Sequence, residues 1–472
     1  MKVLFVASEC SPIAKVGGLA DVVGSLPKAL KSLDVDVSVI LPFYKVVKIK
    51  KSKLRLVKRR IPVFFNQKEE SFNLWKTFLP KSRVPLLLVE NNKYFFGKGV
   101  YVESDASSGG SEKEVARFLF LSAAGIEIAK MMKANILHCQ DWHTALTPYL
   151  IKKESYKIKT LLTIHNLGYQ GIYKSKAVNK LLGTIFPGKQ VNCLKLGILT
   201  ADFINTVSPS YAKEILTRKY GAGLQKYLKK RKKHLTGILN GLDLEVFNPK
   251  TDPFLKKRYS WKNIKDKKYN KIYLQKKCFK KVNLKIPILG IVSRLADQKG
   301  FNLIKGIFRY LMKEELQFIL LGKGSPEYER FFKRVSKRFS GKCYAKTAFD
   351  EELAHQIYGG ADIFLMPSFF EPCGLGQQIA MKYGTIPVAR AVGGIKDTVF
   401  SAKIKGNRVK GNGFLFNRYS KRDLLKVIKK ALGFYEKKDI WKQIQINGMK
   451  QDFSWKKSAK KYKSLYQRII KK

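Results

Sequence analysis

The sequence opens with MKVLFVASECSPIAKVGGLADVVG, residues 1–24, and this stretch decides the fold. Residues 3–7 form a short apolar run, and the loop that follows carries Gly17 and Gly18 before a helical pattern begins. The run is too brief for a signal peptide, and Glu9 interrupts it before any small-residue cleavage site. We therefore expect a buried parallel strand, then a glycine-bearing loop, then a helix.

The same alternation of strand and helix continues along the first half of the chain. Further strands are expected at residues 35–41, 86–89, 136–138, 160–164 and 203–207, and helices at residues 21–31, 113–133 and 209–218. Such alternation predicts a parallel, doubly wound sheet. Residues 45–83 are basic and irregular in pattern, and we expect them to form a peripheral excursion from that sheet.

The second half repeats this organisation after a break in the pattern. A lysine-rich stretch runs from about residue 250 to about residue 285, and alternation then restarts. The expected strands are residues 288–291, 317–321, 363–366 and 386–389. We place the junction near residues 240–249, which predicts one domain over 1–240 and a second over 241–453. Residues 454–472 are predicted to form an amphipathic helix that packs on another part of the chain.

Length and composition limit the class of protein. A chain of 472 residues is expected to form two α/β domains. No apolar stretch approaches the roughly 18 to 20 residues of a membrane span, so we expect a soluble protein without a membrane partner. The six cysteines form no C-x-x-C pair and the five histidines form no H-E-x-x-H helix. This favours a reducing cytosol over a disulfide framework and predicts no structural metal.

The charge is the unusual feature. Lysine and arginine total 93 against 35 aspartate and glutamate residues, which gives a formal net charge of +58. One interpretation is a nucleic-acid-binding protein. The other is lysine spread over solvated surfaces, and we favour it because no RNA-recognition or zinc-finger pattern accompanies the charge. A positive field would still gather an anionic sugar nucleotide.

Candidate phosphate-binding residues follow the first strand. Lys15, Gly17 and Gly18 precede the first helix, where backbone N–H groups, the helix N-terminus and a mobile cation suit a diphosphate. The pattern is neither the G-x-G-x-x-G fingerprint nor a Walker A loop. A glycine pair after a strand can equally be a tight turn.

Polar residues also follow later strands. His138, Asp141 and His143 cluster after one expected strand, and His165 follows the next. The carboxyl ends of strands in an open α/β sheet face the ligand crevice, so these side chains could hold sugar hydroxyls. A histidine at a strand end can also be purely structural.

The second half contains two comparable motifs. Arg294 and Lys299 lie five residues apart at a strand end, which suits a pyrophosphate that gains charge as it leaves. The alternative is a surface ion pair with Asp297. Glu371 and Gly374 lie between the strand expected at 363–366 and a helix, where amides meet a carboxylate.

Taken together, these segments resemble the family of bacterial glycogen synthases and plant starch synthases. The resemblance spans nearly the whole chain, and its most specific parts are AKVGGLAD, QDWHTAL, LTIHNLGYQGIY, SRLADQKG and EPCGLG. It implies the GT-B fold, two Rossmann-like domains with an interdomain cleft. It also implies an enzyme that moves glucose from ADP-glucose to the non-reducing end of an α-1,4-glucan with retention of configuration, without a cofactor or an essential metal. From the cysteine and charge patterns we expect a cytoplasmic protein without a specific nucleic-acid partner.

The resemblance also implies roles for particular residues. Those matching the catalytic set are Glu371, Arg294, Lys299, His165 and Asp141. Those matching the ADP-glucose site are Lys15, Gly17, Gly18, Asp21, Asn240, Phe349, Cys373, Gly374 and Leu375. Phe349 aligns with an aromatic near the adenine, and the final helix is expected to cross back to the N-terminal domain.

Two departures and two alternatives remain. The family's D-N-x-x-R-F reads SEKEVARF at residues 111–118, without the asparagine, and Ile379 occupies the second position of the E-x7-E pattern of many retaining relatives.

A double displacement needs a second carboxylate, for which Asp141 is the one candidate. We therefore favour front-face departure and attack guided by the leaving phosphate. UDP-glucose is the alternative donor.

Overall fold

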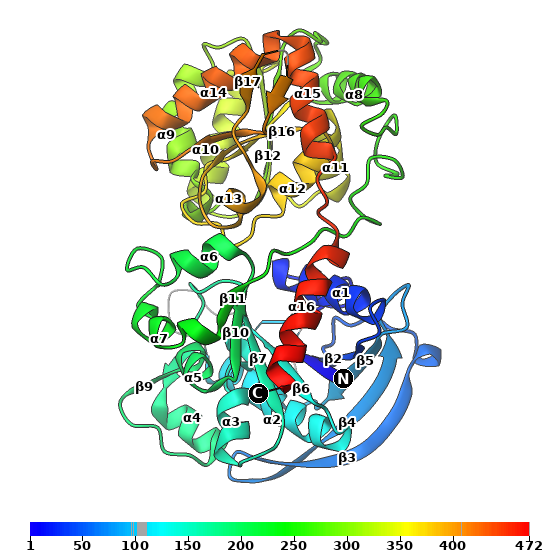
Figure 1. Ribbon diagram of the computed structural model, residues 1–472, viewed down its shortest axis with the longest axis vertical. Helices are drawn as coiled ribbons and strands as arrows, with labels where there is room; N and C mark the ends of the chain where they lie inside the picture. The colour runs from blue at the N-terminus through cyan, green and yellow to red at the C-terminus, as the bar shows by residue number, and fades with distance from the viewer. Residues whose placement is uncertain (96, 98, 102–110, 407, 472) are drawn as a thin grey trace. The chain divides into compact units, whose positions relative to one another are not determined.

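The computed structural model describes residues 1–95, 97, 99–101, 111–406 and 408–471. The described residues fall into two compact units, Met1–Gly241 with Trp455–Lys472, and Leu242–Ser454 (Figure 1). Lys472, the last residue of the predicted C-terminal segment, lies outside the described residues. Within the described ranges, no helix is long and apolar enough to cross a membrane.

In the part of the chain that the structure describes, the first unit is built on a nine-stranded sheet of order β11-β10-β7-β6-β1-β2-β5-β4-β3. The strands that pair in parallel are β11 (Leu235–Gly237), β10 (Phe203–Thr206), β7 (Lys159–Ile164), β6 (Ile136–Gln140), β1 (Lys2–Val6), β2 (Asp36–Pro42) and β5 (Pro85–Glu90). The antiparallel strands β4 (Lys68–Phe78) and β3 (Arg55–Phe65) extend the sheet beyond β5. A short antiparallel pair, β8 (Ile172–Lys174) and β9 (Gln190–Asn192), lies apart from it.

Helices cover both faces of this sheet (Figure 1). They are α1 (Gly18–Lys31), α2 (Glu112–Met131), α3 (Thr147–Lys153), α4 (Ser175–Leu182), α5 (Cys193–Thr200), α6 (Pro209–Glu214), α7 (Gln225–Lys230) and α16 (Trp455–Ile470). The helix predicted over residues 209–218 ends early, at Glu214, and that prediction is wrong at its C-terminus. There the Thr217 hydroxyl donates a hydrogen bond to Glu214 O at 2.7 Å, and such a side-chain bond to the backbone competes with continuation of the helix.

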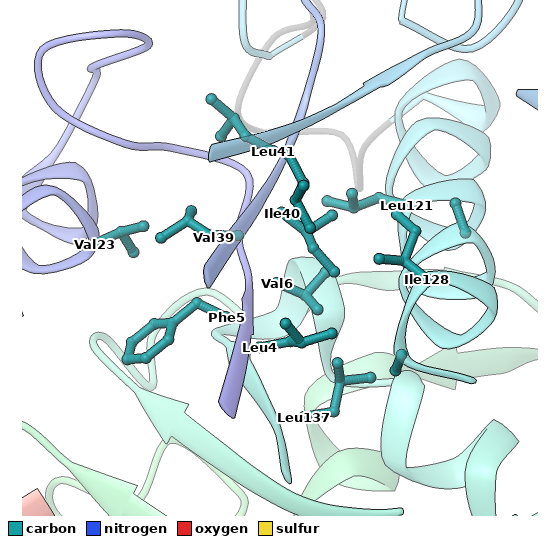
Figure 2. Close-up of a cluster of buried hydrophobic side chains, with 14 of the residues drawn as sticks. Leu4, Phe5, Val6, Val23, Val39, Ile40, Leu41, Leu121, Ile128 and Leu137 are labelled. Carbon is teal, nitrogen blue, oxygen red and sulfur yellow. The ribbon is translucent and has the colours of Figure 1, made fainter. Parts of the chain in front are cut away.

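The central strand β1 shows why the sheet is buried on both sides. Figure 2 shows Leu4 and Val6 directed toward Leu121 and Ile128 of α2, while Phe5 points to the opposite face. All three β1 side chains are fully buried. A strand covered by helices on both faces must be apolar throughout, which is why its sequence shows no alternation of polar and apolar residues.

A chain of buried hydrogen bonds ties α16 to this sheet. Tyr466 OH lies 2.9 Å from His138 Nδ1, His138 Nε2 lies 2.6 Å from Thr163 Oγ1, and the Thr163 hydroxyl donates to Asn205. Asn205 Nδ2 donates to Tyr462 OH at 2.9 Å. Because Thr163 donates onward, it accepts from His138 Nε2–H, so Nδ1 accepts from Tyr466. The network therefore fixes a neutral histidine, and burial holds the pKa of His138 well below its usual range.

The expectation of an irregular excursion over residues 45–83 is wrong. Residues 55–78 of this stretch form the edge hairpin β3–β4, in which Ile61, Val63 and Phe65 alternate inward. The ladder register shifts between Lys58 and Ile61, and Arg60 takes φ +47° at that bulge. Bulges and consecutive exposed cations hid the alternation, and both are ways in which proteins protect an edge strand from pairing with another chain.

The second unit contains, among its described residues, a six-stranded all-parallel sheet of order β14-β13-β12-β15-β16-β19. Its strands are β14 (Cys343–Lys346), β13 (Gln317–Leu321), β12 (Ile288–Val292), β15 (Ile363–Met366), β16 (Ile386–Arg390) and β19 (Phe414–Phe416), with a separate antiparallel pair β17 (Lys403–Lys405) and β18 (Arg408–Lys410). Its helices are α8 (Lys267–Phe279), α9 (Phe301–Leu311), α10 (Pro326–Arg338), α11 (Glu351–Gly360), α12 (Gly376–Lys382), α13 (Gly394–Thr398), α14 (Lys421–Glu436) and α15 (Lys438–Met449). Every strand predicted from the sequence is present, with ends shifted by no more than about two residues.

Some lysines of the basic stretch before β12 point inward. Lys271 Nζ pairs with Asp362 at 2.8 Å, and both side chains are nearly buried. Lys267 Nζ donates to Gly359 O and Thr385 Oγ1, each at 2.8 Å, and burial lowers its pKa to about 7. These lysines hold α8 on the second unit, so part of the lysine excess is structural.

Tyr466→Phe tests the buried network. The change leaves His138 Nδ1 buried without a donor, which should lower the free energy of unfolding by about 1–3 kcal/mol. Urea denaturation of the full chain measures this, with the exposed Tyr310→Phe as the control that should not move the midpoint. An unchanged midpoint for Tyr466→Phe would show that the hydroxyl contributes nothing.

Candidate active site

The order of the strands places a switch point in each sheet. The chain continues from β1 to β2 on one side and later adds β6 on the other, so the first switch point lies between β1 and β6. The same reasoning places the second between β12 and β15. Ligands of open α/β sheets bind outside the carboxyl ends of the strands at such points. The predicted residues that follow these and adjacent strands are Lys15, Gly17, Gly18, Asp141, His165, Arg294, Lys299 and Glu371.

The buried Glu9 side chain holds the loop between β1 and α1 through hydrogen bonds to its backbone. Its Oε2 accepts hydrogen bonds from the N–H of Val16 at 2.8 Å and of Gly17 at 2.7 Å. Lys15 Nζ pairs with Asp21 Oδ1 at 2.6 Å on the exposed side of the loop. The Gly17 amide, expected to face a diphosphate, is thus directed at Glu9 in this structure.

The two glycines of this loop are not required by the protein's own packing. Gly17 has φ −133°, which any residue adopts. A Cβ on Gly18 would meet none of the described residues within 4 Å, and one on Gly17 would only approach the Glu9 carboxylate at 3.9 Å. The tight-turn alternative therefore lacks support, and the missing side chains leave room for another molecule to approach the backbone.

Asp141 is strained and buried at the end of β6. Its backbone has φ +53° and ψ −168°, a region that costs a non-glycine residue about 1–3 kcal/mol and is typical of functional sites. Its N–H donates to Thr163 O at 2.8 Å, and its Oδ1 accepts from the His165 N–H at 2.7 Å. Burial raises the pKa of Asp141 to about 7, and the nearby Glu9 carboxylate adds to the rise. The structure thus brings Asp141 and His165 into contact at the carboxyl ends of the neighbouring strands β6 and β7.

The histidines of this region are neutral. His165 Nε2 lies 2.8 Å from Gln140 Oε1, and burial lowers the pKa of both His165 and His143 to about 3. His143 is only 6% exposed, and its Nδ1 has no hydrogen-bond partner among the described residues. Neutral imidazoles can donate to or accept from sugar hydroxyls, but they do not supply a cation.

In the second unit, Lys299, which is partly buried, forms an ion pair with the buried Glu371. Lys299 Nζ lies 2.8 Å from Glu371 Oε2 and 3.0 Å from Oε1, and Ser368 Oγ donates to Oε2 at 3.0 Å. Arg294 is exposed and lies 3.4 Å from Gln298 Oε1. Asp297, the alternative ion-pair partner, accepts a hydrogen bond from Tyr328. Sequence reasoning named both members of the pair but not their contact.

Two residues that the sequence did not indicate hold the Glu371 loop. Ser368 orients the carboxylate, and Arg390, buried at the end of β16, donates to the carbonyls of Ser368 at 3.3 Å and Phe369 at 2.5 Å. In the sequence, Arg390 could have been recognised as a candidate site residue because it is a cation at the end of an otherwise apolar strand.

Glycines join the loops after β12, β15 and β16. Gly300 has φ +77°, and a Cβ there would lie 2.1 Å from Pro367 O. A Cβ on Gly393 would lie 1.9 Å from Glu371 O. These glycines are structural, because any side chain would push the Glu371 loop out of place.

The other predicted residues are distributed around these groups. Cys373 is buried, with its Sγ 3.6 Å from Gln378 Nε2, and Gly374 has φ +71°. Leu375 is half-buried just before α12. Asn240 is buried after β11, and its Oδ1 has no hydrogen-bond partner in the described part of the chain. Phe349, between β14 and α11, is 89% exposed.

The altered segment, residues 111–118, forms the N-cap and the first turns of α2, and it keeps a structural role. Ser111 caps the helix through the Glu114 N–H, and Arg117 is buried and donates to the carbonyls of Gly99 and Val100.

No group of three or more His, Cys, Asp or Glu side chains within the described ranges could hold a metal ion.

Two family models match the chain, one for each unit. Residues 2–230 match the starch synthase catalytic domain, and residues 275–447 match the glycosyl transferases group 1. With two doubly wound sheets, the first mostly and the second entirely parallel, these matches define a glycosyltransferase of the GT-B fold, which confirms the fold class predicted from the sequence.

Whole-chain relatives give the family. The glycogen synthases of Thermosipho melanesiensis and Thermotoga maritima are 42% and 41% identical, over 100% of this chain and 100% and 99% of theirs. The catalytic domain of starch synthase IV from Arabidopsis thaliana, bound to ADP and acarbose, superposes with a TM-score of 0.88 at 32% identity, covering 100% of this chain and 99% of that one. The chain belongs to the glycogen and starch synthase family. Sucrose-phosphate synthase from Thermosynechococcus elongatus, 17% identical with a TM-score of 0.63 over 99% and 98% of the chains, shares the fold.

His143→Phe tests the buried neutral histidines. An ordinary histidine has a pKa near 6.5, whereas folded His143 has a pKa of about 3, so below pH 6.5 the unfolded chain takes up a proton that the folded chain refuses. This removes about 1.4 kcal/mol of stability per pH unit below 6.5 for each such histidine. Asp141 acts in the opposite direction, because its folded pKa of about 7 favours the folded state as pH falls from 7 to about 4.

Replacing His143 by phenylalanine should therefore reduce the loss of thermal stability between pH 7.5 and 5.5. Melting curves of the wild type and the variant at both values measure the difference. Equal losses in the two proteins would show that His143 takes up its proton in the folded state as readily as in the unfolded state.

Proposed function

We propose that this glycosyltransferase moves glucose from ADP-glucose to the non-reducing end of an α-1,4-glucan, with retention of configuration. The observation that carries the proposal is the open backbone at Gly17 and Gly18, beside Lys15, at the start of α1. Glycines that the protein's packing does not require, followed by a helix N-terminus, suit the close approach of a diphosphate. The related starch synthase IV bound to ADP and acarbose supports a nucleotide and a glucan as partners.

We assign the acceptor glucan to the first unit, residues 1–240 with the helix over 454–472, and the nucleotide sugar chiefly to the second unit, residues 241–453. Asn240, Asp21, Cys373 and the amides near Gly374 complete the proposed donor contacts. The exposed ring of Phe349 is free to stack on an adenine.

The Lys299–Glu371 pair suits the charge separation of this reaction. Breaking the bond between glucose and ADP builds positive charge on the sugar ring and negative charge on the departing diphosphate. A fixed carboxylate beside a fixed ammonium can stabilise the two charges respectively, without reorganisation during the reaction. Arg294 supplies a second cation to the diphosphate.

Asp141 and His165 are proposed to position the glucosyl ring. A carboxyl with a pKa near 7 can either donate to or accept from a sugar hydroxyl, and a neutral imidazole can do the same. Asp141 accepts backbone hydrogen bonds through Oδ1, which fixes its orientation. A group held in this way serves better as a hydroxyl ligand than as a nucleophile, which favours the front-face route.

A donor assay tests the function directly. Purified protein is incubated with glycogen and radiolabelled ADP-glucose or UDP-glucose, and label in the polymer is counted. We expect incorporation from ADP-glucose at least tenfold above that from UDP-glucose. Preference for UDP-glucose would reverse the donor assignment, and no transfer from either donor would refute the proposed function.

Gly18→Ala tests the observation that carries the proposal. Because a Cβ there meets nothing within 4 Å among the described residues, folding stability should be unchanged, while the KM for ADP-glucose should rise at least tenfold. Gly433→Ala in α14 is the matched control: its Cβ is also unobstructed, so stability should rise by up to about 1 kcal/mol with KM unchanged. A Gly18→Ala enzyme with wild-type KM would place the donor elsewhere.

A further inference from the structure

Glu9 is a buried acid that the proposed chemistry does not use. It lies three residues after β1, is 3% exposed, and belongs to none of the motifs assigned a role above. An acidic side chain is almost never this buried unless its charge is compensated. What compensates it indicates what it does.

Three donors from two segments converge on the Glu9 carboxylate. The N–H groups of Val16 and Gly17 both donate to Oε2, and the Tyr101 hydroxyl donates to Oε1. Both oxygens are therefore occupied by the protein itself. With its oxygens occupied and almost no exposed surface, Glu9 is badly placed to touch a substrate directly.

These contacts set the direction in which the loop presents its other groups. With the backbone of Val16 and Gly17 pulled inward, the side chains of Lys15 and Val16 project outward, and Lys15 remains 48% exposed. The Gly18 backbone, at the first position of α1, faces unobstructed space. The base of the loop is closed separately by the paired hydrogen bonds between Cys10 and Ala14, each 2.8 Å. At its tip, Gly17 O accepts from the Ala20 N–H at 3.2 Å, while the Val16 and Gly17 N–H groups are held by Glu9.

We propose that Glu9 is a positioning residue for the nucleotide-sugar donor: by accepting the Val16 and Gly17 N–H groups it holds Lys15 and the Gly18 backbone where the diphosphate binds. This inference rests on the proposed function. It requires the reach of the Glu9 side chain and its two hydrogen bonds, and it does not require the negative charge.

Two conservative variants separate reach from charge. Glu9→Gln keeps the length and an acceptor oxygen for both amides but removes the charge. Glu9→Asp keeps the charge but is shorter by one methylene and cannot reach both amides without moving the loop. Calorimetric titration with ADP should give a Kd within about threefold of wild type for Glu9→Gln and at least tenfold weaker for Glu9→Asp. Melting temperatures, recorded in parallel, show that both variants are folded.

Glu90→Asp is the matched control. Glu90 ends β5 of the same sheet and accepts hydrogen bonds from Asn73 Nδ2 and Trp75 Nε1, each at 2.9 Å, so its partners lie on β4 and not in the β1–α1 loop. Shortening it should lower the melting temperature while leaving the Kd for ADP unchanged. This control separates a general loss of stability from a specific loss of donor binding.

Each outcome decides the proposal. Wild-type affinity in Glu9→Asp would overturn it, and so would equal weakening in Glu9→Gln and Glu9→Asp, because the charge would then be what matters. Gly18→Ala distinguishes this failure from that of the proposed function. If Gly18→Ala weakens ADP binding and Glu9→Asp does not, only the role of Glu9 is refuted. If neither variant changes ADP binding, or the wild type binds no ADP, the donor site itself is wrongly assigned and the proposal for Glu9 falls with it.

Discussion

Polar groups buried at the carboxyl ends of parallel strands must find hydrogen-bond partners inside the protein, and the site depends on how this requirement is met. Glu9 accepts hydrogen bonds from amides further along its own loop, Asp141 accepts one from the His165 amide, and Glu371 pairs with Lys299. In each case the partner lies on a different loop or further along the same one. Satisfying the buried charge therefore also fixes the geometry of the loop that carries the candidate ligand-binding groups.

Two classes of glycine make this arrangement possible, and they have opposite physical meanings. At Gly300 and Gly393 a Cβ would collide with a backbone carbonyl, so these positions let three loops of the second unit pack together. At Gly18 a Cβ would meet none of the described residues within 4 Å, so the protein gains nothing from the glycine in its own packing. Only the second class indicates that a ligand could approach the backbone, and sequence alone does not separate the two classes.

Much of the fold was predictable because buried parallel strands are short, continuous apolar runs, as in residues 3–7 and 318–321. The β3–β4 hairpin was not predictable. Its bulges leave the consecutive residues Lys58, Arg59 and Arg60 all exposed, so the sequence does not alternate between polar and apolar residues there. For the site, the sequence indicated which charged and polar residues follow the strands, but it did not indicate which of them contact each other. Lys299 and Glu371 are 72 positions apart, and only the shared edge of the sheet brings them into contact.

The net charge of +58 acts at a different range from these contacts. Charges on the surface attract any anion over about a Debye length, roughly 8 Å at physiological salt, without regard to its shape. Such a field can raise the encounter rate of a nucleotide sugar, but it gives a neutral glucan no advantage and cannot choose between ADP-glucose and UDP-glucose, which carry the same diphosphate. Selection of the donor must therefore come from short-range contacts, made by loops whose geometry the buried carboxylates maintain. The surface charge and the site are thus separable: the first governs how often an anion arrives, and the second governs which one is used.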